Sequence, residues 1–279
     1  MSRRVRGWRR LAGGAWDSPR DPQFFGDLEV DAASLMRYVD RVRERTGVHV
    51  TMTHLVGRAV AHALVVVPDL RLRVAFGREF MRPTVDVFFV VASVGGQELT
   101  GVKIERADEK PVVELARELS ARTAAIHELG DPEFGRVKRL LTRLPRRLVG
   151  TSLRLSAWLT ADLRLDLPRL GMRRDSFGGA MVTSVGMWGI EHAYSPLASY
   201  YRVPVLVLVG SVTHKPVAVA GQVVVRPVLG LTATFDHRYV DGFHAASFAR
   251  AVREYCANPA AYEPPLAPAS ARDVIGTEP

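Results

Sequence analysis

The stretch that decides the fold is Thr232-Ala-Thr-Phe-Asp-His-Arg-Tyr-Val-Asp-Gly-Phe-His244, which runs from an apolar strand-like segment into an amphipathic helix. Histidine suits proton transfer near neutral pH because its reference pKa is about 6.5. His237 stands where the strand ends, a position at which a rigid scaffold can hold a reactive side chain. Asp241 fits the N-cap of a helix over residues 242–257. A single histidine is more often structural than catalytic, but the ionisable residues around His237 favour a catalytic role.

Two stretches carry a resemblance to a known family. Phe235-Asp-His-Arg-Tyr-Val-Asp-Gly242 resembles the His-x-x-x-Asp-Gly signature of the chloramphenicol acetyltransferase superfamily, in the Asp-His-Arg form typical of the dihydrolipoamide acyltransferase catalytic subunits of 2-oxoacid dehydrogenase complexes. Gly178-Gly-Ala-Met-Val-Thr-Ser-Val-Gly-Met-Trp-Gly-Ile190 resembles the glycine-bounded strand of that family. Residues 28–93 and 204–216 are also similar, so the resemblance covers most of residues 25–262.

The resemblance implies a coenzyme A-dependent acyltransferase that moves an acyl group between thiols, or to an acceptor that the sequence does not name. Coenzyme A or acyl-coenzyme A would be its substrate. His237 would act as the general base, because the attacking thiol must become a thiolate. Asp241 would orient the loop, and Gly242 would let backbones approach closely. Asp236 and Arg238 complete the motif as structural residues.

A hydroxyl group is expected to stabilise the oxyanion of such a reaction. The resemblance implies that it comes from the strand between Gly178 and Gly186. Alignment backwards from Gly186 selects Thr183, whereas alignment forwards from Gly179 selects Ser184, because this stretch is one residue shorter than the family pattern. Successive side chains of a strand point to opposite faces, so only one of the two can serve. The better match of the Val-Gly-Met-Trp-Gly end favours Thr183.

The expected strands and helices follow one another in groups along the chain and do not strictly alternate. This order predicts an α+β fold with a largely mixed sheet. The resemblance specifies a chloramphenicol acetyltransferase-like two-layer sandwich. The expected strands are residues 28–31, 70–76, 84–94, 98–105, 179–185, 203–212 and 222–236. The expected helices are residues 32–46, a helix from Thr51 or Thr53 to Pro68, and residues 110–127 and 242–257.

Residues 1–24 form a basic arm, residues 25–262 the catalytic domain, and residues 263–279 a C-terminal tail. No apolar run reaches the roughly 18–20 residues of a membrane-spanning helix, and no secretory signal is evident, so a cytoplasmic protein is expected. The single cysteine, Cys256, is expected in the core. No zinc-ligand spacing or phosphate-binding glycine loop occurs, so no metal is expected, and His54 and His62 are interpreted as structural.

Residues 128–177 form a basic helical insert, longer than the segment that usually joins these elements in the family. Residues 134–174 contain eleven Arg or Lys against Asp162 and Asp166, a local net charge of +9. Pro145 is expected to break its first helix. The insert can be a helical pair packed on the sheet, a helix lying on an anionic membrane surface, or a cover over the active site that holds an acyl chain or a carrier protein. Nucleic acid is not expected as a partner, because no recognised binding motif accompanies the charge.

The resemblance also implies a homotrimer, or a multiple of a trimer, in which the histidine of one chain faces the hydroxyl of its neighbour. Full-length family members carry lipoyl and subunit-binding domains before the catalytic domain. This chain is expected to be a stand-alone form, served by a separate lipoyl or acyl-carrier protein. The alternative is a catalytically silent trimeric scaffold or binding module. A nonribosomal-peptide condensation domain shares the His-x-x-x-Asp-Gly motif but usually has a doubled histidine, and position 236 here is Asp.

Overall fold

A computed structural model describes residues 22–92, 99–129, 135 and 141–266 of the chain. The predicted basic arm lies outside the described residues except for its last three positions. Much of the first insert helix and most of the C-terminal tail also lie outside them.

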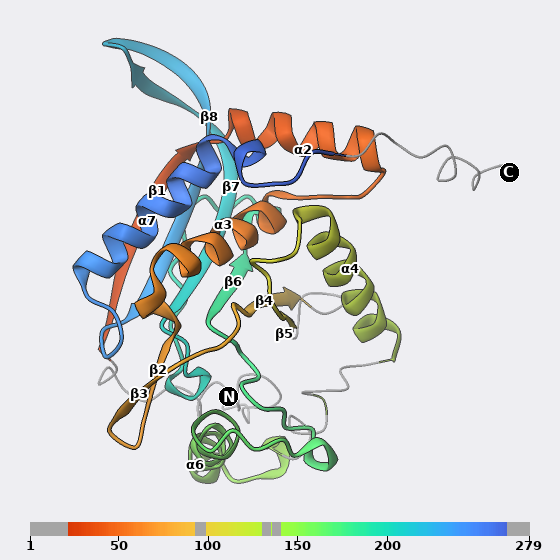
Figure 1. The fold of residues 1–279 in the computed structure, drawn as a ribbon, viewed down its shortest axis with the longest axis vertical. Helices are drawn as coiled ribbons and strands as arrows, with labels where there is room; N and C mark the ends of the chain where they lie inside the picture. Colours follow the sequence, from red (N-terminus) through yellow and green to blue (C-terminus); the bar gives the residue numbers. More distant parts are fainter. Residues whose placement is uncertain (1–21, 93–98, 130–134, 136–140, 267–279) are drawn as a thin grey trace, which may run out of the picture.

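A six-stranded sheet forms the centre of the molecule (Figure 1). Its strand order is β1-β8-β7-β6-β4-β5. The strands are β1 Gln23–Asp31, β4 Val87–Ala92, β5 Leu99–Ile104, β6 Ala180–Ser184, β7 Val205–Val219 and β8 Gln222–Asp236. Strand β6 runs parallel to both β4 and β7, whereas the other pairs are antiparallel. The predicted mixed sheet is therefore confirmed.

Four helices cover one face of this sheet, which confirms the predicted two-layer α+β architecture (Figure 1). They are α2 Ala33–Thr46, α3 Met52–Val66, α4 Val112–Leu129 and α7 Gly242–Ala257. Local sequence sets their ends. Gly47 ends α2 in the left-handed conformation, and Pro68 follows one residue after the C-cap of α3. The bounds of α7 are those that the sequence predicts.

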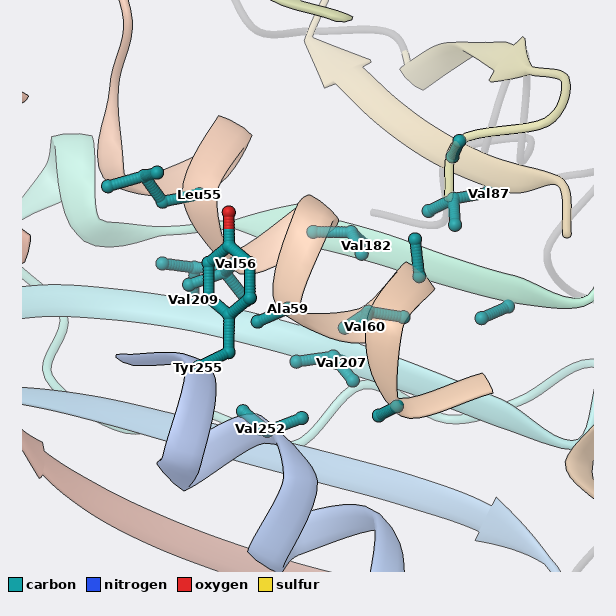
Figure 2. Close-up of a cluster of buried hydrophobic side chains, with 14 of the residues drawn as sticks. Leu55, Val56, Ala59, Val60, Val87, Val182, Val207, Val209, Val252 and Tyr255 are labelled. Carbon is teal, nitrogen blue, oxygen red and sulfur yellow. The ribbon is translucent and has the colours of Figure 1, made fainter. Parts of the chain in front are cut away.

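The core lies between α3, α7 and the middle of the sheet. Figure 2 shows apolar side chains of α3 facing sheet residues on one side and α7 residues such as Tyr255 on the other. Helix α3 sits close to the sheet because Gly57 has no side chain. A Cβ atom there would come within 2.3 Å of the Phe89 ring of β4. Cys256 is fully buried, as predicted, and burial raises the pKa of its thiol to about 12.

Glu263 joins three of these helices, although the sequence places it in the tail. Its carboxylate pairs with Arg58 Nε of α3 at 2.8 Å and accepts hydrogen bonds from Tyr255 Oη of α7 and the Val112 backbone N–H of α4. Glu263 is 7% exposed and Arg58 is 6% exposed. The packed domain therefore extends at least to residue 263, one residue beyond the boundary that sequence reasoning assigns.

The sequence pattern predicts only parts of two hairpins that the structure contains. Strands β7 and β8 continue past the sheet as a long ribbon, which projects from one end of the molecule (Figure 1). Ala220 and Gly221 both have positive φ, which fits the tight two-residue turn at its tip. A separate two-stranded sheet pairs β2 Leu72–Ala75 with β3 Arg78–Met81, and β3 was missed by the sequence pattern.

The insert contributes α6, Arg146–Ala157, which begins directly after Pro145 as the predicted helix break requires. Val149 and Leu153 of α6 form a small apolar cluster with Leu141, and Tyr200 packs against it. For α6, the expected packing on the sheet is therefore not found, and much of the other helix of the expected pair lies outside the described residues. Helix α6 packs on the 3-10 turn Ser199–Tyr201 at the end of the molecule opposite the β7–β8 ribbon (Figure 1).

His54 is structural, as predicted, and caps the helix that carries it. Its Nδ1 atom accepts a hydrogen bond from the Thr51 backbone N–H at 3.0 Å, which satisfies one free donor at the start of α3. Burial lowers the pKa of His54 from 6.5 to about 4, with smaller contributions from His49 and Arg43. A protonated Nδ1 could no longer accept this bond, so the folded chain holds His54 neutral.

We expect this histidine to make the protein less stable in mild acid. The unfolded chain binds a proton at His54 below pH 6.5, whereas the folded chain resists protonation until about pH 4. The stabilising contribution is therefore complete above pH 6.5 and declines as the pH falls towards 4, by about 3 kcal/mol in total.

The measurement is the free energy of unfolding by urea at pH values between 4 and 8 for the wild type and for His54→Gln. The glutamine amide oxygen can accept the Thr51 hydrogen bond but does not titrate. Wild-type stability should fall more steeply below pH 6.5 than that of the variant. Parallel curves would contradict the assignment of this pH dependence to His54.

Candidate active site at the two ends of the sheet

His237 lies exposed just beyond the end of β8. Its backbone N–H donates to the Pro22 carbonyl oxygen at 2.7 Å, and its ring packs on Phe24 with the centroids 5.0 Å apart. Phe24 in turn stacks on Phe235, which belongs to the core. The histidine is thus supported by β1 and β8 while its ring remains accessible, as a general base requires.

Asp236 and Arg238 brace the turn around His237. Asp236 is 6% exposed, and its carboxylate accepts hydrogen bonds from the Arg238 backbone N–H at 3.0 Å and from Arg238 Nε at 2.9 Å. The Asp236 carbonyl oxygen accepts from the backbone N–H groups of Tyr239 and Val240. Four hydrogen bonds to one residue therefore fix the backbone on both sides of the catalytic candidate.

Asp241 closes the far end of this loop as the N-cap of α7. Its carboxylate accepts from the backbone N–H groups of Phe243 and His244, at 3.0 and 3.1 Å, and lies 2.7 Å from His244 Nδ1. The hydrogen bond from the His244 backbone N–H is the largest cause of a lowered Asp241 pKa. His244 Nε2 also lies 3.2 Å from the Asp69 carboxylate. The sequence identified the N-cap but not His244 or Asp69.

Gly242 does not have the surroundings predicted for it. A Cβ atom at this position would meet no heavy atom within 4 Å inside the chain. The expected close approach of backbones is therefore not found within one subunit. Gly242 is the first residue of α7.

The structure separates Thr183 and Ser184 by face. Met181 of β6 belongs to an apolar cluster with Phe88 and Leu206, distinct from the helix-covered core that contains Val182. Since side chains alternate along a strand, Thr183 points to the same face as Met181, and Ser184 points towards the helices. Thr183 therefore lies on the face of the sheet that the four helices leave open.

His237 and Thr183 cannot meet within one chain. Thr183 lies opposite Leu208 of β7, which lies opposite Thr232 of β8. His237 is five residues further along β8 and two strands away. At about 3.3 Å per residue and about 4.8 Å between strands, the two positions are on the order of 15–20 Å apart. A base and an oxyanion donor must both lie within hydrogen-bond reach of one reacting group, so His237 and Thr183 of the same chain are too far apart to act together.

A strap formed by residues 186–198 crosses the open face between these two residues. Thr232 Oγ1 donates to the Ala193 carbonyl oxygen, and Thr234 Oγ1 donates to that of Ser195 at 2.7 Å. The strap reaches β1, where the Gln23 side chain exchanges two hydrogen bonds with the Leu197 backbone. It therefore spans β7, β8 and β1 on the same face as Thr183.

Two glycines allow the strap to lie flat on the sheet. A Cβ atom at Gly210 of β7 would come within 1.9 Å of the Glu191 carbonyl oxygen, and one at Gly230 of β8 within 2.6 Å of the same atom. Neither glycine was singled out from sequence. An isolated glycine inside a strand pattern is nevertheless a signal for close backbone approach and could have identified this crossing.

The strap also presents apolar side chains to solvent. Met187 is 76% exposed and Trp188 is 54% exposed, directly after Thr183 and the end of β6. Ile190 and Tyr194 are exposed further along, and Tyr194 packs its ring edge against exposed Phe25 of β1. A cluster of exposed large apolar residues of this kind is typical of a surface that binds a partner.

We expect Gly210→Ala to disturb the strap. The added Cβ would overlap the Glu191 carbonyl oxygen, so the strap or β7 must shift, at a cost of about 1–3 kcal/mol in the free energy of unfolding. Gly242→Ala is the matched control because its Cβ meets nothing, and its effect should stay within about 0.5 kcal/mol. Urea unfolding of both variants tests this. Equal stability of Gly210→Ala and wild type would contradict the close approach.

Among the described residues, no group of three or more His, Cys, Asp or Glu side chains could hold a metal ion. Within the same residues, no helix has the length and apolar character needed to cross a membrane.

The folded arrangement is similar to solved structures. A crystal structure of the Azotobacter vinelandii dihydrolipoamide acetyltransferase, studied for the role of one serine, one histidine and one asparagine in its catalytic mechanism, covers 87% of this chain and 84% of its own, with 20% identity and a TM-score of 0.64. A chloramphenicol acetyltransferase covers 85% of this chain and 89% of its own, with 13% identity and a TM-score of 0.50. These likenesses confirm the predicted fold class.

Sequence comparisons find similarity to one family in the part of the chain that contains Thr183 and His237. The dihydrolipoyllysine-residue acetyltransferase component of the acetoin cleaving system of Bacillus subtilis is 27% identical over 218 residues, 78% of this chain and 44% of that protein. The chain spans less than half the length of the curated relatives it matches. Residues 172–262 match the model of the 2-oxoacid dehydrogenases acyltransferase catalytic domain. This segment contains both Thr183 and His237, and it is similar to the acyltransferase catalytic domain of the 2-oxoacid dehydrogenases.

Proposed function

We propose that this protein is an acyltransferase that moves an acyl group between the thiol of coenzyme A and a second thiol, with a dihydrolipoyl group as the expected acceptor or donor. The observation that carries the proposal is the family match over residues 172–262, which includes Thr183 and His237 together. An accessible His237 on a braced turn supports it. Coenzyme A is a substrate in this proposal, and no metal takes part.

His237 acts as the general base. It takes the proton from the attacking thiol, and the resulting thiolate attacks the thioester carbonyl carbon. When the tetrahedral intermediate collapses, the carbon–sulfur bond to the leaving thiol breaks, and His237 returns the proton to that sulfur. In the Azotobacter vinelandii enzyme, the histidine and asparagine studied for catalysis are four positions apart, as are His237 and Asp241. Asp241 holds the loop through its cap on α7 instead of touching substrate.

Thr183 is the proposed oxyanion donor. Its hydroxyl faces the open side of the sheet, whereas Ser184 faces the helices. Because His237 and Thr183 of one chain are on the order of 15–20 Å apart, the donor must come from a second copy. The active site is therefore proposed to lie between subunits, with His237 of one chain facing Thr183 of its neighbour.

The exposed strap supports this assembly. Met187, Trp188 and Ile190 follow Thr183 closely and would be covered by the neighbouring subunit that brings His237. In this arrangement, one surface of a chain contacts a different surface of its neighbour, so the contact is head-to-tail. The proposed assembly closes this contact as a ring. A homotrimer, or a multiple of one, is the proposed assembly. A separate lipoyl or acyl-carrier protein is the proposed source of the second thiol.

We expect His237→Ala to abolish most acyl exchange. Loss of a general base lowers the rate of the chemical step by about 10²–10⁴-fold. The measurement is exchange between a panel of acyl-coenzyme A thioesters and dihydrolipoamide, and the panel also begins to identify the acyl group. His127→Ala, on the exposed end of α4, is the control and should keep wild-type activity. A folded wild type that exchanges no thioester would favour the silent scaffold.

We further expect two inactive variants to complement each other. Thr183→Ala should lose about 10²–10³-fold in kcat as an oxyanion donor is removed, whereas Ser184→Ala should lose little. When Thr183→Ala and His237→Ala chains are unfolded, mixed in equal amounts and reassembled, about one quarter of the interfaces combine an intact histidine with an intact threonine.

The mixture should therefore recover about one quarter of wild-type activity, while each variant reassembled alone stays inactive. Mixing His237→Ala with a second His237→Ala sample is the control for reassembly. No recovery, from particles shown to contain both chains, would contradict a shared site. A greater loss in Ser184→Ala than in Thr183→Ala would reverse the choice of oxyanion donor.

A further inference from the structure

Helix α6 has two apolar faces. The inner face carries Val149, Leu153 and Ala157, which are at most 8% exposed, and Tyr200 supports it. This inner face is the side on which α6 contacts the rest of the described residues. The opposite face therefore needs a separate explanation.

The outer face of α6 is apolar and open to solvent. Leu148 is 50% exposed and Leu155 is 53% exposed, two helical turns apart on the same side. Trp158, at the start of the turn that continues α6, is 42% exposed. Helical periodicity places Leu148, Leu155 and Trp158 in one arc opposite the buried residues. The arc follows the outside of a cylinder and is therefore convex, and α6 lies at the end of the molecule opposite the β7–β8 ribbon (Figure 1).

The charge around this arc is positive. Residues 141–161 contain Arg143, Arg146, Arg147 and Arg154 and no acidic residue. Arg147 and Arg154 are exposed and flank one edge of the apolar arc. Asp162, the first acidic residue after the helix, pairs with Arg202 at 3.1 Å. The exposed arginines beside the arc, Arg147 above all, therefore favour a partner that is anionic as well as apolar.

We propose that the outer face of α6 docks on an anionic membrane surface, with Leu148, Leu155 and Trp158 at the level of the lipid headgroups and the arginines against the lipid phosphates. Amphipathic helices of this kind, with Leu and Trp on one face and basic residues beside it, lie in the membrane interface. A convex helix face favours a lipid surface over a folded protein, because lipids fill the space around it without a matching groove.

Docking by α6 would orient the proposed active site. Tyr200 supports α6 and lies only a few residues before β7, whose first residue Val205 pairs with Phe235 near the end of β8. The His237 end of the sheet and α6 are therefore at the same end of the molecule, and the β7–β8 ribbon points the other way (Figure 1). The docking itself does not depend on the proposed acyl transfer, so either can fail without the other.

The test is co-sedimentation of the full chain with vesicles of phosphatidylcholine alone and of phosphatidylcholine mixed with phosphatidylglycerol. Wild type should bind the mixed vesicles at least about tenfold more tightly, and binding should weaken as salt is added. The double variant Leu155→Gln/Trp158→Gln should lose this binding. Arg143→Gln/Arg147→Gln should reduce the preference for anionic vesicles.

The matched control is Val223→Gln/Val225→Gln on the β7–β8 ribbon, where the two valines are 77% and 68% exposed at the opposite end. This variant should bind vesicles as the wild type does. Circular dichroism and size-exclusion chromatography of each variant check its fold and assembly.

Three results would overturn the proposal: wild type that stays in the supernatant at low salt, equal binding to neutral and anionic vesicles, or full binding by Leu155→Gln/Trp158→Gln. A folded Leu155→Gln/Trp158→Gln variant with a smaller assembly would also overturn it, and would identify the outer face as a subunit contact.

Discussion

The helical layer depends on one buried carboxylate. Glu263 pairs with Arg58 of α3, accepts from Tyr255 of α7 and accepts from the first backbone N–H of α4. Removing two charges from water is costly, and the cost is recovered only when the remaining donors are also satisfied. Arg58 meets this condition, since it donates as well to the carbonyl oxygens of Ala107 and Asp108. Three helices are thereby held as one layer, which fixes the sheet beneath them.

Because these helices cover only one face, the other face of the sheet is left for function. The strap covers part of it at close range, since Gly210 and Gly230 leave room for the Glu191 carbonyl oxygen. Thr183 lies on this face and is partly buried, and Met187 and Trp188, shortly after it in the chain, are exposed. Exposed apolar side chains beside Thr183 are the feature of this face on which the proposed contact with a second subunit rests.

Thr183 and His237 differ in how they are held. Thr183 is placed by the register of β6 between its parallel neighbours, which hydrogen bonds of the sheet determine. His237 is placed by a turn whose backbone is bound to Pro22 and Asp236. Both are set by main-chain contacts, so their positions are defined before any substrate binds. The proposed site, assembled from two such parts, would therefore need little reorganisation during the reaction.

The sequence by itself determined the features that depend on neighbouring residues. The bounds of α7, its Asp241 cap and the position of His237 after an apolar strand follow from periodicity and capping, which act within a few residues. Only the tertiary structure decided which of Thr183 and Ser184 faces the open side, because a one-residue shift in alignment reverses every side chain of a strand. It also decided that Glu263 belongs to the core, since the burial of a carboxylate depends on Arg58, a partner 205 residues away in the chain.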